Sequence, residues 1–258
     1  MRKESFLLKI WNVLWPLFIY LIAQNGVSLL GMAVFSFLGS AEELYYQYAA
    51  GLVLIAALVC IPIYLKMYQK DEAEAGEQKN TVPMENKDYL LVILSGAALA
   101  MAFNNIIALT PLPIWFTAYE ETNEVIYGGG IILQLLSAGI FACIVEEVSM
   151  RGIVYGRMKR YWGKKRAMIF SALVFGIYHL NVVQAVYAFV LGLYFVWLKE
   201  RYQNLWAPCI AHMSANMFII LMAGSSVFQK ILETMVGFCL ITCISLLIFY
   251  YSWRMIKE

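Results

Sequence analysis

The sequence of residues 126–150 is IYGGGIILQLLSAGIFACIVEEVSM. It is long and apolar enough to cross a bilayer as a helix, which takes about 20 residues. Two adjacent acids, Glu146 and Glu147, stand near its end, and Arg151 follows directly after it. An ionisable side chain inside a bilayer costs roughly 2.5–3.5 kcal/mol, so such residues usually serve a function there. This stretch therefore predicts a membrane helix that carries chemistry.

The composition of the whole chain predicts a membrane protein. Of its 258 residues, 62% are hydrophobic and 14% are charged, whereas soluble domains carry roughly 25% charged residues. We expect an all-α fold, a polytopic transmembrane helical bundle of about eight spans. The eight apolar stretches cover residues 8–38, 47–67, 89–110, 126–150, 166–182, 184–198, 207–224 and 231–252.

The basic residues predict how the bundle is oriented. If the N-terminus is cytoplasmic, 18 of the 19 lysines and arginines fall at cytoplasmic helix ends and loops, and only Lys230 falls outside. Cytoplasmic loops of membrane proteins carry such an excess of positive charge. We therefore predict that both termini are cytoplasmic. Six basic residues lie within 157–166, which we interpret as a cytoplasmic loop; binding of anionic lipid or of a substrate tail is the alternative.

A polar segment, residues 69–88, divides the chain. Its composition is too polar to bury a core, so we expect a flexible cytoplasmic linker. It separates a two-span N-terminal region, residues 1–68, from a six-span region, residues 89–258. The intramembrane acids of interest and both histidines of the chain lie in the six-span region.

Spacing separates the roles of the two adjacent acids. Glu147 and Arg151 are four residues apart, so on a helix they share a face and can pair. Glu146 is rotated from Glu147 by about 100° and points elsewhere. Glu146 is thereby left as the free carboxylate and as the candidate general base.

The chain has only two histidines, and each has a polar or aromatic partner four residues away. Phe175 and His179 share a helix face, where the ring can limit the histidine's rotamers and exclude water. His212 and Asn216 also share a face and can donate two hydrogen bonds to one oxygen, as in an oxyanion hole.

The sequence predicts different depths in the membrane for residues that are expected to act together. Glu146 and His212 are expected near cytoplasmic helix ends, whereas His179 lies 13 residues after Arg166, or about 20 Å along a straight helix. Either the fifth helix begins outside the bilayer, or it tilts strongly, or a predicted helix boundary is wrong.

Taken together, these residues resemble the three signature motifs of the CAAX-protease and bacteriocin-processing family (CPBP, also called Abi). Its members are intramembrane endopeptidases related to the Ras-converting CAAX prenyl protease. The resemblance covers about residues 89–224, and one departure is Met150, where members usually have an aromatic residue. The motifs stand in the order Glu146-Glu147-x-x-x-Arg151, Phe175-x-x-x-His179 and His212-x-x-x-Asn216.

The resemblance implies an all-helical core with a cavity open to the cytoplasm and the bilayer. It also implies catalytic roles for four residues. Glu146 and His179 would activate the attacking water, and His212 and Asn216 would stabilise the oxyanion. The residues with an implied supporting role are Glu147, Arg151 and Phe175.

Zinc is the alternative to a glutamate mechanism. Two histidines and a glutamate can bind this ion, and here the set would be Glu146, His179 and His212. The His-Glu-x-x-His sequence typical of zinc proteases is absent from the chain. We therefore favour a mechanism without a cofactor.

The sequence thus predicts a multi-pass peptidase of the cell membrane that cleaves near the cytoplasmic face. The expected partners are a peptide or membrane-anchored protein substrate and the lipid bilayer, and not nucleic acid. A non-catalytic bacteriocin self-immunity or membrane scaffold protein is the alternative. A transporter that relays protons through its intramembrane acids would be expected to show a repeat, and we find none.

Overall fold

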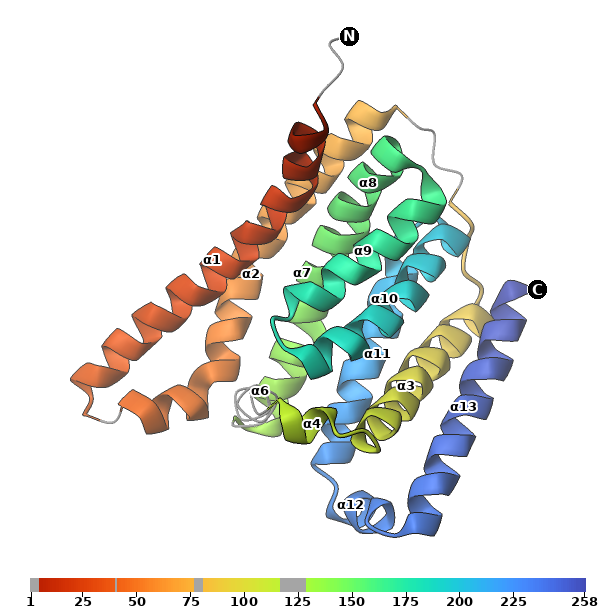
Figure 1. Ribbon diagram of the computed structural model, residues 1–258. Helices are drawn as coiled ribbons and strands as arrows, with labels where there is room; N and C mark the ends of the chain where they lie inside the picture. Colours follow the sequence, from red (N-terminus) through yellow and green to blue (C-terminus); the bar gives the residue numbers. More distant parts are fainter. Residues whose placement is uncertain (1–4, 40, 77–80, 117–128) are drawn as a thin grey trace.

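The computed structural model describes residues 5–39, 41–76, 81–116 and 129–258, and helices make up most of them (Figure 1). No strand occurs within these ranges, so the all-α prediction is confirmed. In chain order the helices are α1 (Phe6–Phe37), α2 (Ala41–Ala75), α3 (Asn86–Ala108), α4 (Leu112–Trp115), α6 (Ile131–Gln134), η1 (Leu135–Phe141), α7 (Ala142–Glu147), η2 (Val148–Val154), α8 (Tyr155–Trp162), α9 (Lys164–Tyr178), α10 (Val182–Tyr202), α11 (Trp206–Ala223), α12 (Ser226–Leu232) and α13 (Met235–Lys257).

Seven helical segments in the described part of the chain are long and apolar enough to cross a membrane. The chain is therefore a multi-pass membrane protein. The segments are Phe6–Phe37, Glu42–Ala75, Asn86–Ala108, Ile131–Trp162, Val182–Tyr202, Trp206–Ala223 and Met235–Lys257.

The one expected span that is not among these seven is the fifth, residues 166–182, which corresponds to the shorter helix α9. With 15 residues it covers about 22 Å, less than the roughly 30 Å of a hydrocarbon core. It nevertheless forms one arm of a hairpin with α10, so the chain runs along the bundle eight times (Figure 1). The start of α1 and the end of α13 consequently lie toward the same end of the bundle. The end of α13 lies beside that of α10, where Arg201 donates to the Ile256 carbonyl at 3.0 Å.

The central helix runs without a break from Ile131 to Trp162 and includes two π-helical stretches, η1 and η2, on either side of α7. The expected end at residue 150 is therefore wrong. The helix ends only before Gly163, whose backbone has φ +80° and ψ 163°, a conformation that is accessible almost only to glycine. Glu146 consequently lies in the middle of a long helix and not near its end.

The turn at Gly163 explains how Glu146 and His179 reach the same depth, although the sequence predicts different depths for them. Glu146 lies 17 residues before this glycine and His179 lies 16 residues after it. Because α9 packs back along the central helix, nearly equal helical rises bring both residues to about the same level. The turn thus brings Glu146 and His179 close together.

Ion pairs tie the helices together at the end that holds this turn. Arg157 donates to both carboxylate oxygens of Asp71 at 2.6 and 2.9 Å, and Lys159 and Lys164 each lie 2.8 Å from the Glu200 carboxylate. Arg160 also lies 3.5 Å from Asp71. Four of the six basic residues within 157–166 therefore have acidic partners in the chain itself, which supports a structural role for them.

Asp71 also explains a difference at the predicted linker, residues 69–88. The α2 helix continues to Ala75, because Asp71 is buried against the arginines of α8. Since α3 begins at Asn86, the segment between the two helices is shorter than expected. Residues 77–80 of the predicted linker lie outside the described residues.

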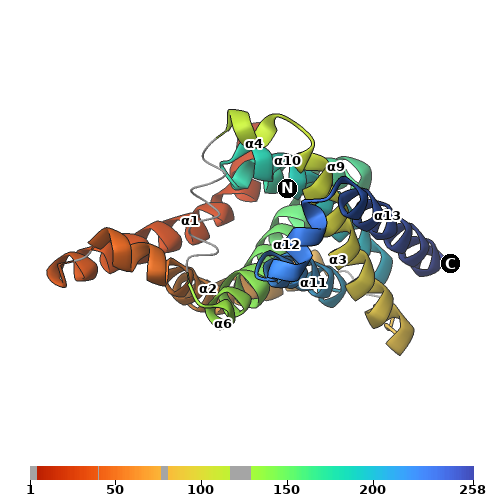
Figure 2. The same ribbon diagram turned by 90° about the horizontal axis from the view of Figure 1, so that it is seen from below.

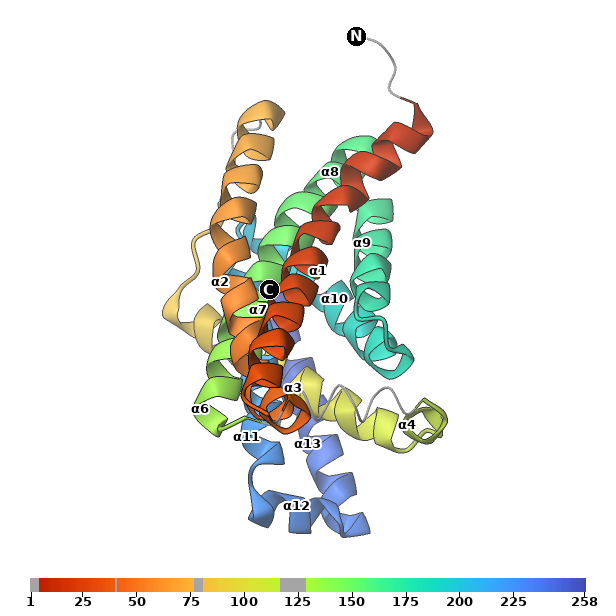
Figure 3. The same ribbon diagram turned by 90° about the vertical axis from the view of Figure 1, so that its left-hand side faces the viewer.

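The N-terminal hairpin of α1 and α2 joins the rest of the protein along only part of its length. At its far end the two helices reach away from the other helices (Figure 2). Figure 3 shows the same hairpin facing the viewer, in front of the other helices. Nearer the middle, Tyr20, Cys60 and Tyr64 pack with Val145 and Ile153 of the central helix. The hairpin therefore contributes to the interior beside Glu146.

We expect Asp71→Ala to destabilise the protein by about 3 kcal/mol, because it leaves a partly buried arginine without its partner. The measurement is thermal unfolding of the purified protein in detergent micelles. Glu74→Ala is the control, because Glu74 forms an exposed pair with Lys70 at 3.8 Å, and such pairs contribute at most about 1 kcal/mol. Equal effects of the two substitutions would contradict the structural role of Asp71.

Candidate active site

A buried carboxylate, Glu147, lies at the centre of the site. Its side chain is 0% exposed, and its Oε1 accepts hydrogen bonds from Arg151 at 2.9 Å and from His212 Nδ1 at 2.8 Å. The pairing of Glu147 with Arg151 that the spacing predicts is thus present. Because His212 belongs to α11, one carboxylate oxygen joins two helices that are far apart in sequence.

Aromatic rings and a backbone carbonyl enclose Arg151. Its guanidinium lies 4.1 Å from the ring centre of Phe175 and 5.3 Å from that of Phe195, in positions that favour a cation above a ring. It also donates to the Gly192 carbonyl at 3.5 Å. A Cβ at Gly192 would lie 3.2 Å from Phe175, so the absent side chain lets α10 approach α9 closely. Arg151 is therefore held by residues of α9 and α10 and by Glu147 of its own helix.

His179 caps the C-terminal end of α9, and its hydrogen bond fixes which ring nitrogen carries a proton. Its Nδ1 lies 2.8 Å from the carbonyl oxygen of Phe175, and its ring meets the Phe175 ring edge-on at 4.9 Å. A carbonyl oxygen only accepts hydrogen bonds, so Nδ1 is the donor. In neutral His179 the other nitrogen, Nε2, then has a free lone pair and is able to take up a proton.

His212 is nearly buried and lies between the two carboxylates. Its ring stacks on Phe195 at 4.8 Å, its Nδ1 donates to Glu147, and its Nε2 lies 3.7 Å from Glu146 Oε2. Because Nδ1 carries a proton, Nε2 of neutral His212 has none to donate. A donor role at Nε2 therefore requires the doubly protonated ring.

Asn216 points its amide toward the central helix. The Nδ2 group donates to the Ala138 carbonyl at 2.9 Å and to Cys143 Sγ at 3.3 Å. Both amide hydrogens therefore have partners in this arrangement. To donate to the same oxygen as His212, as the sequence predicts, Asn216 has to turn away from at least one of these partners.

The candidate catalytic residues open onto one cavity of about 330 Å³. Its walls include Glu146, His179, His212 and Asn216. Glu146 is 18% exposed, whereas Glu147 and Arg151 do not line the cavity and lie behind it. The two adjacent acids thus differ as the sequence predicts: one is neutralised by a buried arginine, and the other faces the cavity.

Further polar side chains from outside the three motifs also line this cavity. They are Tyr20, Gln24, Asn104 and Gln184. Nothing in the motif spacing points to them, because they come from α1, α3 and the start of α10. Gln24, Asn104 and Gln184 stand out in the sequence, because they are polar residues within or beside apolar stretches. Nothing in the sequence distinguishes Tyr20.

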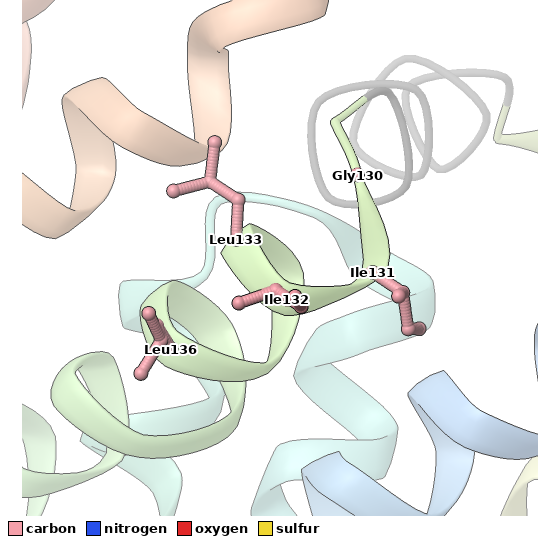
Figure 4. A pocket seen from close by; sticks show the side chains of 5 residues that line it. All are labelled: Gly130, Ile131, Ile132, Leu133 and Leu136. Atoms are coloured by element: carbon pink, nitrogen blue, oxygen red, sulfur yellow. The ribbon is translucent and has the colours of Figure 1, made fainter.

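A second hollow lies on the surface where the central helix begins (Figure 4). It is lined by Gly130, Ile131, Ile132, Leu133 and Leu136. These residues carry no ionisable or nucleophilic side chain. This hollow therefore offers no chemistry, and the cavity at Glu146 is the candidate active site.

The residues considered for zinc are not assembled as metal ligands. Within the described ranges no three His, Cys, Asp or Glu side chains are grouped so that they could hold a metal ion. In both His179 and His212 the Nδ1 atom is bonded within the protein, to Phe175 and Glu147 respectively, which leaves each Nε2 unbonded to the described residues, as in histidines that bind metals. Zinc is therefore disfavoured by the distance between the candidate ligands: in the described part of the chain, Glu146 and the two histidines are not grouped around one point.

Residues 128–218 match the family described as type II CAAX prenyl endopeptidase Rce1-like. This part of the chain is thus similar to an Rce1-like CAAX-protease domain. The matched region includes all three motifs. The resemblance to the CAAX-protease family is thereby confirmed. The α1–α2 hairpin and α3 lie outside the matched region.

A relative of the chain supports the same kind of activity. The chain is 24% identical over 173 residues to YdiL of Bacillus subtilis (strain 168), which is named as a candidate membrane peptidase. The match covers 65% of this chain and 68% of the relative. No solved structure matches the chain. The two matches support a peptidase of the CAAX type.

We expect Arg151→Met to destabilise the protein by about 3–5 kcal/mol, because it leaves the buried Glu147 carboxylate without its cation. Arg254→Met is a matched control: Arg254 also pairs with a glutamate four residues away, but both partners are exposed. The control substitution should cost at most about 1 kcal/mol. Thermal unfolding of both variants in detergent measures the difference, and a small effect of Arg151→Met would contradict the central position of the Glu147 pair.

Proposed function

We propose that the chain is an intramembrane endopeptidase that hydrolyses a peptide bond near the cytoplasmic membrane face. The observation that carries this proposal is the cavity-facing carboxylate of Glu146. It lies 3.7 Å from His212 Nε2 and shares a cavity with His179. Its neighbour Glu147 is occupied by Arg151 and His212. The Glu146 carboxylate and the accepting Nε2 of His179 are together suited to activating a water molecule.

The proposed reaction begins with a water molecule held between Glu146 and His179 Nε2. One of these groups accepts a proton while the water oxygen attacks the peptide carbonyl carbon. The carbonyl oxygen of the tetrahedral intermediate then carries a negative charge. The carbon–nitrogen bond breaks and the accepted proton moves to the leaving amine. The water oxygen and its second hydrogen remain in the new carboxyl group, which then loses this proton to the medium and becomes a carboxylate.

The negative oxygen of the intermediate requires hydrogen-bond donors. We assign this role to His212 and Asn216, as the resemblance implies. His212 has to be doubly protonated to donate from Nε2, and the Glu147 carboxylate, which accepts a hydrogen bond from Nδ1 at 2.8 Å, stabilises the charged ring. Asn216 has to exchange its bond with the Ala138 carbonyl for one with the substrate. Both groups therefore strengthen their contact as charge develops, which is what accelerates a reaction.

The substrate we propose is a peptide or a membrane-anchored protein, and the place of action is the cell membrane. A protein with several membrane spans and a cavity between them meets such a substrate at the bilayer. The partners are accordingly this substrate and the surrounding lipid, and nucleic acid is not among them.

The first test compares cells that express the native chain with cells that express Glu146→Gln, and maps new protein and peptide termini by mass spectrometry. We expect termini that appear with the native chain and are lost in Glu146→Gln and in His179→Ala. Glu233→Gln is the control, because Glu233 is exposed at the end of α12. Identical termini in all samples, at equal protein levels, would contradict a peptidase and favour the immunity or scaffold role.

We further propose that the peptidase works without a metal, because Glu146, His179 and His212 are not grouped as three ligands of one ion in the described part of the chain. Once a cleaved peptide is known, the purified protein should cleave it at an unchanged rate after incubation with 1,10-phenanthroline. Elemental analysis of purified protein that was not exposed to the chelator should find well below one zinc ion per chain. Loss of cleavage with the chelator, restored by added zinc, would overturn the glutamate mechanism.

A further inference from the structure

The cavity has a contributor that the Rce1-like domain itself does not supply. Tyr20 and Gln24 of α1 line it together with Glu146, although α1 lies outside residues 128–218. The N-terminal hairpin therefore adds polar groups to the candidate active site.

Contacts with two other helices fix the position of Tyr20. The buried Tyr64 hydroxyl of α2 donates to the Pro16 carbonyl at 2.7 Å and accepts from the Tyr20 N–H at 3.2 Å. Pro16 has no N–H, so the Asn12 carbonyl lacks its usual helical donor. Arg157 of α8 donates to that carbonyl instead. The turn of α1 before Tyr20 is thus held by α2 and by the central helix.

The Tyr20 hydroxyl is a buried donor that the protein does not use. The residue is 2% exposed, and its hydroxyl makes no hydrogen bond of normal geometry with any described residue. It lies beside Gln24 and within electrostatic range of Glu146. An unsatisfied buried polar group costs about 1–3 kcal/mol, so its presence next to the candidate base indicates a partner that arrives with the substrate.

The two donors that the sequence motifs supply are less readily available than this hydroxyl. The amide hydrogens of Asn216 are bonded to Ala138 and Cys143, and His212 has to gain a proton before Nε2 can donate. A tyrosine hydroxyl is neutral, already carries its hydrogen, and turns freely about its C–O bond.

We propose that Tyr20 is a further catalytic residue, whose hydroxyl donates a hydrogen bond to the scissile carbonyl oxygen as this oxygen gains negative charge. The inference rests on the proposed peptidase function. Tyr20 keeps its proton throughout, so the bonds that form and break and the proton transfers are those described above. The hydroxyl stabilises the intermediate, and its effect falls on the rate of cleavage and not on binding of the substrate.

The test is Tyr20→Phe, which removes the hydroxyl and keeps the ring. The probe is the set of termini that depend on the native chain, followed over time after induction of expression. We expect their rate of formation to fall about 10²-fold or more, as for loss of one oxyanion donor. The thermal unfolding midpoint should change little, because the lost hydroxyl makes no hydrogen bond of normal geometry with the described residues.

Tyr202→Phe is the matched control. The Tyr202 hydroxyl is also buried without a hydrogen bond of normal geometry to the described residues, but Tyr202 does not line the cavity. Its removal should leave the rate unchanged. A second readout separates catalysis from binding: the double variant Glu146→Gln/Tyr20→Phe should retain uncleaved precursor on affinity purification as well as Glu146→Gln alone.

The outcomes distinguish the two proposals. If the native chain cleaves, Glu146→Gln does not, and Tyr20→Phe cleaves at the native rate, the role of Tyr20 is overturned and the peptidase stands. Loss of precursor in the double variant would also overturn it, since Tyr20 would then act in binding. If the native chain yields no new termini, both proposals fall.

Discussion

The site depends on one buried carboxylate oxygen, Glu147 Oε1, which is shared by Arg151 and His212 at 2.9 and 2.8 Å. An isolated buried charge is strongly unfavourable, so Glu147 requires its arginine. Once Arg151 is in place, the aromatic rings of Phe175 and Phe195 pack over its guanidinium. The carboxylate thus determines how α9, α10 and α11 meet the central helix.

This arrangement leaves Glu146 with a different environment from its neighbour. A single residue of helical rotation directs Glu146 into the cavity, where His212 Nε2 lies 3.7 Å away. The turn at Gly163 brings His179 to the same level. A fixed, charge-compensated cluster behind the cavity and a free carboxylate within it together form a preorganised site.

Much of this site is predictable from the sequence, because its key contacts are local. The Glu147–Arg151 pair and the neighbouring rings of Phe175 and His179 follow from spacing along a helix. The helix end at Trp162 and the extension of α2 to Ala75 do not, since Gly163 and the long-range pair of Asp71 with Arg157 determine them. Tyr20 and the partners of Asn216 likewise depend on tertiary packing, so no pattern in the chain indicates them.

The most direct test of the central position of Glu147 is a double-mutant cycle with Glu147→Gln, Arg151→Met and the double variant. The measured quantity is the free energy of unfolding in detergent. We predict a coupling of about 2 kcal/mol, with the double variant less destabilised than the sum of the single ones, because it buries no uncompensated charge. Costs that add within about 0.5 kcal/mol would show that the two residues do not act as a pair and would contradict the account.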